Sequence, residues 1–278
     1  MADRLRIGAV SYLNARPLCD RLIDLDSGVD LHLDYPSVLA SMLAAGKLDA
    51  AMIPSVEYLR GRATGADYRV VPGVAIATRG PVRSVKLLTR VPFRDIQSLS
   101  LDQGSRTSQV LAQIWLAERF QVRPGRLELL DLGASPLESR ADAVLLIGDR
   151  AMTVRDESFL NVIDLGQAWN ELTGLPFVFA FWVVRAGVDE TRLIELFQHA
   201  RDDGMLRVRK IANEAAARMG FDPDYCHEYL TQNLSYDLNS SEIAGFRLFA
   251  EKAAALGLAP EGVRLVFAED RLHPATRD

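Results

Sequence analysis

The stretch "RIGAVSYLNARPL" (residues 6–18) decides how the rest of the chain is interpreted. It opens with apolar residues that predict a buried strand, and the polar residues Ser11, Tyr12 and Asn14 follow directly. Pro17 fits the first turn of a helix, so the polar group lies between a strand and a helix. In open α/β sheets, ligands bind where strands end and helices begin. The stretch therefore predicts an α/β fold with a ligand site at this strand end.

Strand-like and helix-like segments alternate through the first two-thirds of the chain, which is typical of mostly parallel sheets with crossover helices. The alternation restarts near Ser84, and after "FVFAFWVVR" the pattern becomes helical. We therefore predict two lobes, each built on a mixed sheet flanked by helices. Residues 1–83 form the first part of lobe I, residues 84–183 form lobe II, and residues 184–278 complete lobe I with a mainly helical part.

Two crossings between the lobes are predicted, near residues 78–88 and near residues 179–185. Together they would form a two-strand hinge with a cleft between the lobes. In the helical part we expect one long helix or two helices that meet near Gly204, and a last helix capped by Ser240 or Ser241.

Composition excludes several classes of protein. The chain has 278 residues, of which 49% are hydrophobic, and its net charge of -5 is spread along the sequence, so we expect no nucleic-acid or membrane partner. No uninterrupted apolar stretch follows the basic start, and the longest apolar run, residues 175–184, is about half a membrane span. These features predict a cytoplasmic protein. The sequence does not determine the oligomeric state, and a homodimer is one of the possibilities.

Common catalytic signatures are missing from the sequence. It has no glycine-rich nucleotide loop, no zinc-protease motif and no nucleophile elbow. The two cysteines are too few for a disulfide framework, and no pair of histidines has metal-ligand spacing. We therefore expect neither a metal nor a nucleotide cofactor. The histidines are His32, His199, His227 and His273, and the cysteines are Cys19 and Cys226.

Two further strand ends carry polar residues. In "GSRTS", Ser105, Thr107 and Ser108 stand immediately before a helix, where hydroxyls and free backbone N–H groups suit a carboxylate. An ordinary N-cap needs only one Ser or Thr, so three hydroxyls and an arginine favour a binding site. In "LLIGD", Gly148 allows close backbone approach to a ligand, while Asp149 is equally well explained as a helix cap.

Four other residues complete the predicted cleft. Ser55 ends the third strand and Ser84 opens the second crossing strand, although each is equally explained as a cap or turn residue. Trp169 and Thr173 lie before the returning strand, where an indole and a hydroxyl can line a pocket, but Trp169 can as well close the core. Together these positions predict a cleft rich in neutral donors and poor in bases.

Seven stretches span nearly the whole chain. They are "IGAVSYLNARPL", "GKLDAAMIPSVEY", "RSVKLLTR", "GSRTSQVL", "DAVLLIGDRA", "DLGQAWNELTGLPFVFAFW" and "YLTQNLSYDL". Together, and in this order, they resemble the chorismate dehydratases of the futalosine route to menaquinone. The resemblance implies the periplasmic-binding-protein type II fold and loss of water from chorismate to give 3-[(1-carboxyvinyl)oxy]benzoate, without a cofactor. A sister branch, the 1,4-dihydroxy-6-naphthoate synthases, differs at the opening motif, and "SYLNARPL" indicates the dehydratase.

With that resemblance, the residues take on roles as hypotheses. Asn14 is the first candidate for catalysis, because its amide can donate to the departing hydroxyl or the enolpyruvyl carboxylate and accept from the substrate. The proton acceptor is the substrate's own enolpyruvyl carboxylate or, on the protein side, Asp149. The main alternative is a cytoplasmic binding or sensor protein of the same fold that captures a small carboxylate. Substrate binding is assigned to Ser11, Tyr12, Ser55, Ser84, Ser105, Thr107, Ser108, Gly148, Trp169 and Thr173.

Overall fold

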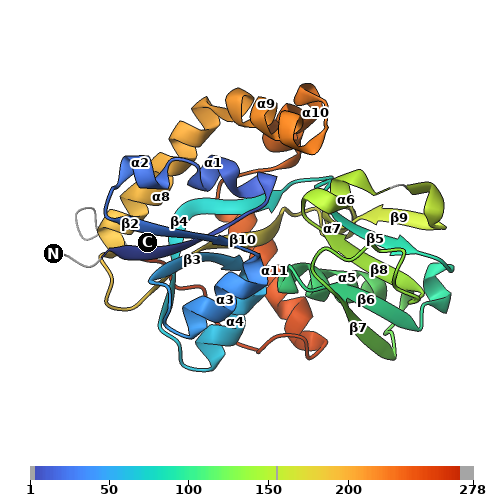
Figure 1. The fold of residues 1–278 in the computed structure, drawn as a ribbon. Helices are drawn as coiled ribbons and strands as arrows, with labels where there is room; N and C mark the ends of the chain where they lie inside the picture. The colour runs from blue at the N-terminus through green and yellow to red at the C-terminus, as the bar shows by residue number, and fades with distance from the viewer. Residues whose placement is uncertain (1–3, 155, 270–278) are drawn as a thin grey trace.

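The computed structural model describes residues 4–154 and 156–269, and in it two five-stranded sheets lie side by side (Figure 1). The sheet of lobe I has the strand order β2-β1-β3-β10-β4, in which β1 is parallel to β2 and β3 while β10 runs antiparallel to β3 and β4. The sheet is therefore mixed, as predicted. Its strands are β1 (Leu5–Val10), β2 (Val29–Asp34), β3 (Ala50–Pro54), β4 (Tyr68–Thr78) and β10 (Phe177–Arg185).

Lobe II repeats this plan with the order β7-β6-β8-β5-β9. Strand β6 is parallel to β7 and β8, and β5 runs antiparallel to β8 and β9. The neighbouring strands β6 and β8 are buried along their whole length. Burial explains the wholly apolar sequence AVLLI of β8, whereas β6 (SLSLD) also buries two serines and an aspartate. The strands are β5 (Val85–Thr89), β6 (Ser98–Asp102), β7 (Arg126–Leu130), β8 (Ala143–Ile147) and β9 (Asn161–Asp164).

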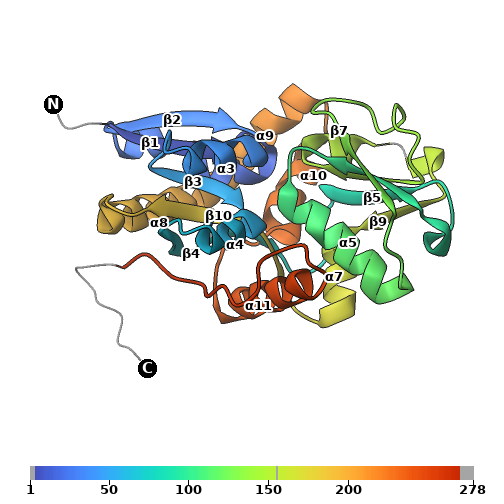
Figure 2. The same ribbon diagram turned by 90° about the horizontal axis from the view of Figure 1, so that it is seen from below.

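Helices cover both sheets, and one of them contacts both lobes. Helix α11 packs against β10 of lobe I and α5 of lobe II, and Figure 2 shows it running along the underside of the molecule. The helices up to lobe II are α1 (Arg16–Cys19), α2 (Leu22–Leu25), α3 (Pro36–Ala44) and α4 (Ser55–Ala63), with a 3-10 turn at Leu13–Ala15. Lobe II holds α5 (Arg106–Phe120), α6 (Asp149–Thr153) and α7 (Leu165–Thr173), with 3-10 turns at Phe93–Asp95 and Asp156–Ser158. The helical part holds α8 (Glu190–Leu206), α9 (Val208–Met219), α10 (Pro223–Glu228), a π-helix (Tyr229–Asn233) and α11 (Ser240–Ala255).

The segments that join the lobes are residues 79–84, between β4 and β5, and residues 174–176, between α7 and β10. The sequence placed the second crossing near residues 179–185 and ended lobe II at residue 183. Strand β10 instead pairs with β3 and β4 of lobe I from Phe177 onward. An apolar run shows that a strand is buried, but it does not show which sheet buries it.

The helix boundaries follow local sequence with one correction. The chain breaks between α8 and α9 at Arg207, close to the expected Gly204. Helix α11 is capped by Asn239, not by Ser240 or Ser241, which are its first two residues. Asn239 and Glu242 form a capping box in which each side chain accepts from the other residue's backbone N–H.

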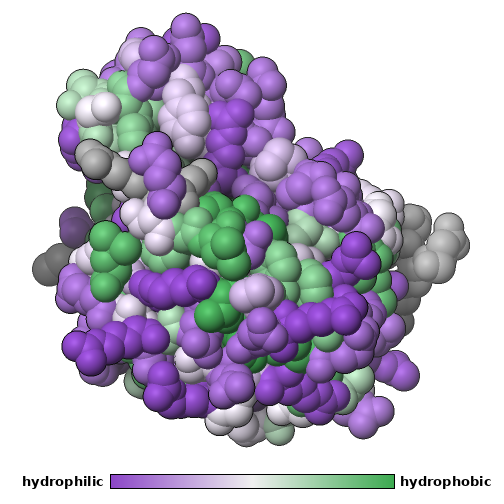
Figure 3. Space-filling model, turned by 90° about the vertical axis from the view of Figure 1, so that its right-hand side faces the viewer, coloured by the Kyte–Doolittle hydropathy of each residue, from purple (hydrophilic) through white to green (hydrophobic). Residues whose placement is uncertain are grey.

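Hydrophobic residues are visible on the surface of lobe II. The end of the molecule formed by lobe II shows hydrophobic residues among hydrophilic ones (Figure 3). Exposed large hydrophobic side chains of this lobe line neither of the two hollows described below; they are Leu127, Leu129, Leu137 and Leu160. Among residues 4–154 and 156–269, no helix is both long and apolar enough to cross a membrane.

Candidate functional site

A cavity of about 40 Å³ lies between the lobes where the predicted strand ends meet. One water needs roughly 10–15 Å³ of such volume, so the cavity has room for about three waters and not for a ring-sized ligand. The structure therefore shows a closed arrangement. Six predicted site residues line it: Tyr12, Asn14, Ser84, Ser105, Ser108 and Gly148. The other lining residues are Val10, Pro36, Pro54, Ile76, Val82, Val85, Ile147, Phe179 and Ala180.

Asn14 presents the only buried side-chain polar atom without a partner among the lining residues that the structure describes. It lies in the 3-10 turn that follows β1, and its Oδ1 accepts no hydrogen bond. Buried polar atoms in folded proteins are nearly always hydrogen-bonded, because leaving one unpaired costs about 1–3 kcal/mol. An amide oxygen left in this state at a cavity wall is suited to accept from a ligand.

Tyr12 closes the cavity against two glycines of lobe II. A Cβ added to Gly104 would come 2.7 Å from the Tyr12 hydroxyl, and one added to Gly148 would come 2.6 Å from the Tyr12 ring. Gly148 also has φ +73, a conformation that side-chain-bearing residues rarely adopt. Burial, with Asp102 adding to it, raises the pKa of Tyr12, so its hydroxyl stays protonated and able to donate.

Ser105 and Ser108 form the start of α5. Ser105 is the N-cap, because its Oγ accepts from the Ser108 backbone N–H at 3.4 Å, and the two hydroxyl oxygens are 3.0 Å apart. The N-cap explanation therefore applies to Ser105. Both side chains nevertheless line the cavity, at the positive end of a 15-residue helix.

Thr107 and Ser55 meet each other between the lobes but do not line the cavity. Thr107 Oγ1 accepts from the Val56 backbone N–H at 3.2 Å and lies 3.4 Å from Ser55 Oγ, and Ser55 donates to the Val178 carbonyl at 2.8 Å. These bonds tie the start of α5 in lobe II to the start of α4 in lobe I. In the closed arrangement both hydroxyls are used by the protein itself.

Asp149 also bridges the lobes. It is the first residue of α6, and its Oδ1 accepts from the Leu13 backbone N–H at 3.0 Å. Burial raises the pKa of its carboxyl above the usual range, although the Leu13 hydrogen bond and Arg218 act in the opposite direction. Its side chain is not among those that line the cavity.

Three predicted residues lie elsewhere. Ser11 is exposed at the end of β1 and does not line the cavity. Trp169 is buried in the core against Phe177 and Phe249, where its Nε1 donates to the Pro176 carbonyl at 3.1 Å. Thr173 donates to the Trp169 carbonyl at 2.8 Å and serves the turn that ends α7. The structure thus matches the core-closing interpretation of Trp169.

Asp102, at the end of β6, supports the site but was not singled out in the sequence. It is 1% exposed, and its carboxylate accepts from the backbone N–H groups of Gly104 at 2.8 Å and Ile147 at 3.1 Å. Arg150 pairs with it from α6. This pair holds the loop before Ser105 and the loop at Gly148 in register. The signal in the sequence that could have found it is an acidic residue between the strand "SLSL" and the loop "GSRTS".

Tyr229, the first residue of "YLTQNLSYDL", is the second residue that the sequence analysis did not assign to the site. Its hydroxyl donates to Ser84 Oγ at 2.8 Å, and both side chains are buried. The two residues are 145 positions apart, so no local pattern connects them.

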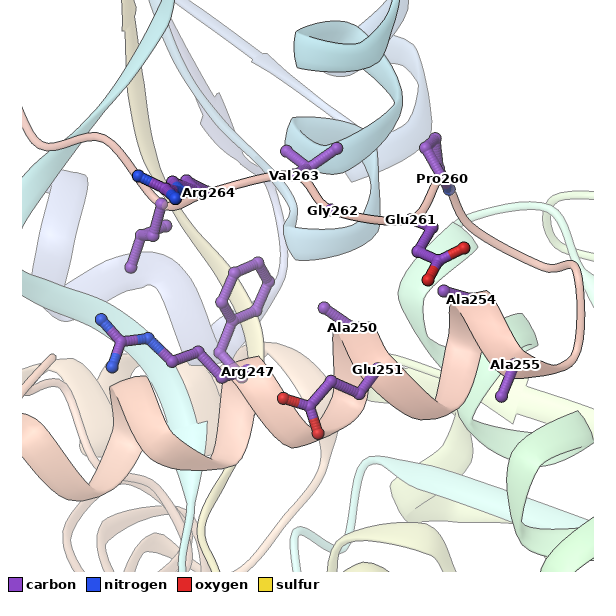
Figure 4. A pocket seen from close by; sticks show the side chains of 12 residues that line it. Arg247, Ala250, Glu251, Ala254, Ala255, Pro260, Glu261, Gly262, Val263 and Arg264 are labelled. Atoms are coloured by element: carbon purple, nitrogen blue, oxygen red, sulfur yellow. The ribbon is translucent and has the colours of Figure 1, made fainter.

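A larger hollow of about 640 Å³ lies between α11 and residues 260–265 (Figure 4). None of the predicted residues line it. Its charged lining residues are Arg247, Glu251, Glu261 and Arg264, all of them exposed, and Figure 4 shows Arg247 and Arg264 toward one end and Glu261 toward the other. Because it gathers no buried polar group, we assign the functional site to the smaller interlobe cavity.

Comparison with known proteins agrees with the sequence pattern. A sequence model of the family described as "Menaquinone biosynthesis" matches residues 5–255. The chain is 30% identical over 274 residues to the chorismate dehydratase of Thermus thermophilus, covering 91% of this chain and 95% of that protein. It is 23% identical over 188 residues to the 1,4-dihydroxy-6-naphthoate synthase of Streptomyces coelicolor, covering 63% of this chain and 66% of that protein.

Solved structures identify the fold. The periplasmic aliphatic sulphonate binding protein SsuA from Escherichia coli matches 95% of this chain and 96% of its own with a TM-score of 0.61, at 17% sequence identity. A likeness at that identity concerns the fold alone. The predicted two-lobe fold of periplasmic binding proteins is therefore confirmed.

Proposed function

Because this chain belongs to the menaquinone-biosynthesis family, we propose that it is a chorismate dehydratase, a hydro-lyase that removes water from chorismate to give 3-[(1-carboxyvinyl)oxy]benzoate. The relative with that name covers nearly the whole chain, whereas the match to the sister synthase is shorter and weaker. The observation in the structure that carries the proposal is the unpartnered Asn14 Oδ1 in a cavity between two lobes.

The cavity walls suit a dianion. Chorismate carries two carboxylates. Ser84 and one hydroxyl of the Ser105–Ser108 pair, the one that does not donate to the other, offer hydrogens beside the start of α5. The ring carboxylate is conjugated with the double bond next to the carbon that loses its proton, so charge grows on its oxygens as a dienolate forms. Fixed donors at those oxygens stabilise that charge more than they stabilise the ground state.

Asn14 is assigned to the departing hydroxyl. Its amide N–H₂ donates to the leaving oxygen, and its unpartnered Oδ1 accepts from the substrate in the same complex. A leaving hydroxide that receives a hydrogen bond is a better leaving group, because the bond strengthens as its charge develops.

The ring proton is assigned to the substrate's own enolpyruvyl carboxylate. Asp149 is the protein-side alternative, and its raised pKa suits a base. Two observations favour the substrate: Asp149 does not line the cavity, and its Oδ1 is already bound to the Leu13 N–H. An intramolecular acceptor held in position needs no protein base, and aromatisation supplies the driving force.

Opening and closing of the two lobes are part of the proposed mechanism. The cavity as described is too small for chorismate, so the lobes open for binding and close around the ring. The interlobe bonds of Thr107 and Asp149 would then form in each cycle. As the relatives act on biosynthetic intermediates, we also place the protein in the cytoplasm.

Incubation of the purified protein with chorismate tests the proposal. Chromatography with mass detection should show chorismate replaced by a product lighter by one water. Saturable binding with chorismate unchanged would instead support the alternative, a binding or sensor protein that uses this fold as SsuA does.

A further inference from the structure

Ser84 lines the cavity and accepts a hydrogen bond from Tyr229, a residue that does not line it. The Tyr229 hydroxyl donates to Ser84 Oγ at 2.8 Å, and Tyr229 is completely buried. Burial raises the pKa of Tyr229 well above its ordinary value, with the Ser84 hydrogen bond acting in the opposite direction. The phenol therefore remains a donor at any working pH.

The hydrogen bond from Tyr229 leaves the hydroxyl hydrogen of Ser84 free. A serine hydroxyl has one hydrogen and two lone pairs. In Ser84 one lone pair is used by Tyr229, and among the described residues no acceptor takes the hydroxyl hydrogen. Ser55 is the contrast, because its hydrogen is donated to the Val178 carbonyl. Ser84 thus keeps a hydrogen for a ligand in the cavity, and Ser55 does not.

The phenol is held in place by the segment that carries it. Tyr229 begins the π-helix, and Asn233, at its end, donates from Nδ2 to the Pro81 carbonyl at 2.9 Å. Thr78 Oγ1 donates to the Asn233 carbonyl at 2.8 Å. The end of the π-helix is therefore bonded to the last residue of β4 and to the first crossing, whose last residue is Ser84. π-helical turns often occur at functional sites.

We propose that Tyr229 is a positioning residue that acts through Ser84. By occupying the acceptor side of Ser84 Oγ, it orients the serine hydrogen toward the cavity and makes Ser84 a donor to a carboxylate of the substrate. Two hydroxyls in series also polarise one another, which strengthens the bond that reaches the anion. This inference rests on the proposed function, since it supplies one of the carboxylate donors assigned there.

A double-mutant cycle of Y229F and S84A tests the inference. Y229F removes only the hydroxyl, and we expect kcat/KM for chorismate to fall about tenfold, which equals roughly 1.4 kcal/mol and matches the loss of one hydrogen bond near a charge. In the S84A background the same change should have no further effect, because Tyr229 then has nothing to orient.

Y236F is the matched control. Tyr236 is also buried, but its hydroxyl has no hydrogen-bond partner, so we expect kcat/KM to remain within about twofold of wild type. Thermal unfolding of each variant shows that the assays are run on folded protein. A purely structural Tyr229 would lower the Tm in Y229F while kcat/KM of the folded variant stays at the wild-type value.

Two results overturn the inference: wild-type kcat/KM in Y229F, or the same loss from Y229F in both backgrounds. Neither bears on the proposed function, which is tested by turnover in the wild-type protein. If the wild-type protein binds chorismate without converting it, the proposed function fails. The cycle is then run on the Kd for chorismate, with the same expected non-additivity and the same contradicting result.

Discussion

Both lobes contribute a wall of the cavity from the ends of their strands. The two walls differ in whether their polar atoms have hydrogen-bond partners within the protein. In lobe II, Ser105 and Ser108 bond to each other, and Asp102 fixes the loops around them. In lobe I, Asn14 Oδ1 is buried without a partner. Lobe II therefore presents hydroxyls that are already held in place by the protein, which we propose as the anion site, whereas lobe I presents a buried acceptor that no protein group satisfies.

Replacing Asn14 with alanine should have the largest effect. We expect kcat to fall by about 10²–10³, as when one donor to a developing charge is removed. The Tm should stay the same or rise, because no protein hydrogen bond of Oδ1 is lost. Steady-state kinetics and calorimetry check both.

The control for Asn14 is Asn170→Ala, in which an amide on α7 loses a bond to the Leu175 carbonyl outside the cavity. It should keep its activity. A lowered Tm with retained turnover in Asn14→Ala would mean that Asn14 serves the fold and that the two walls do not differ as described.

Gly104→Ala changes the cavity wall on the side of lobe II. The new Cβ would lie 2.7 Å from the Tyr12 hydroxyl, so the tyrosine must move from the cavity wall. We expect kcat/KM to fall about tenfold, equal to roughly 1.4 kcal/mol of transition-state stabilisation. Gly125→Ala is the matched control, since no atom lies within 4 Å of its Cβ. Equal activity in both variants would show that the contact of Tyr12 is irrelevant to turnover.

Asp149→Asn should have the smallest effect on turnover. If the substrate carboxylate takes the proton, the asparagine, which can still accept from the Leu13 N–H, keeps kcat within about fivefold, whereas loss of a protein base costs about 10²–10⁴. A loss of that size would assign the proton to Asp149.

Stability reports on the same carboxyl independently. Because burial raises the pKa of Asp149, its contribution to the free energy of unfolding is full below the unfolded pKa of about 3.9 and is lost as pH rises through the folded pKa. Asp149→Asn should remove this part of the pH dependence, so its Tm should decline less than that of wild type as the pH rises from about 4 to about 8. Parallel Tm curves would contradict a buried, pKa-raised carboxyl.

Local pattern was enough for most of the fold, because buried strands and amphipathic helices repeat with short periods. Strand β9 was missed, since its four half-buried residues, Asn161–Asp164, alternate in no clear way. The assignment of β10 to a sheet required pairing with β3 and β4, which lie about a hundred residues or more earlier in the chain.

The rule that ligands bind where strands end and helices begin found residues such as Tyr12, Asn14 and Gly148, whose backbone position alone brings them to the cavity. It could not tell where a side chain points, and so Trp169, which packs into the core, was placed in the pocket. It also could not find Tyr229, which reaches Ser84 only through tertiary packing of the π-helix.

A crystal structure of Asn14→Ala grown with chorismate would show whether the substrate binds between the two cavity walls. We expect intact chorismate between the lobes, with a carboxylate at Ser84, Ser105 and Ser108 and the ring hydroxyl facing the space that the Asn14 amide occupied. Chorismate bound elsewhere, such as in the hollow under α11, or with its carboxylates away from the serines, would contradict the account.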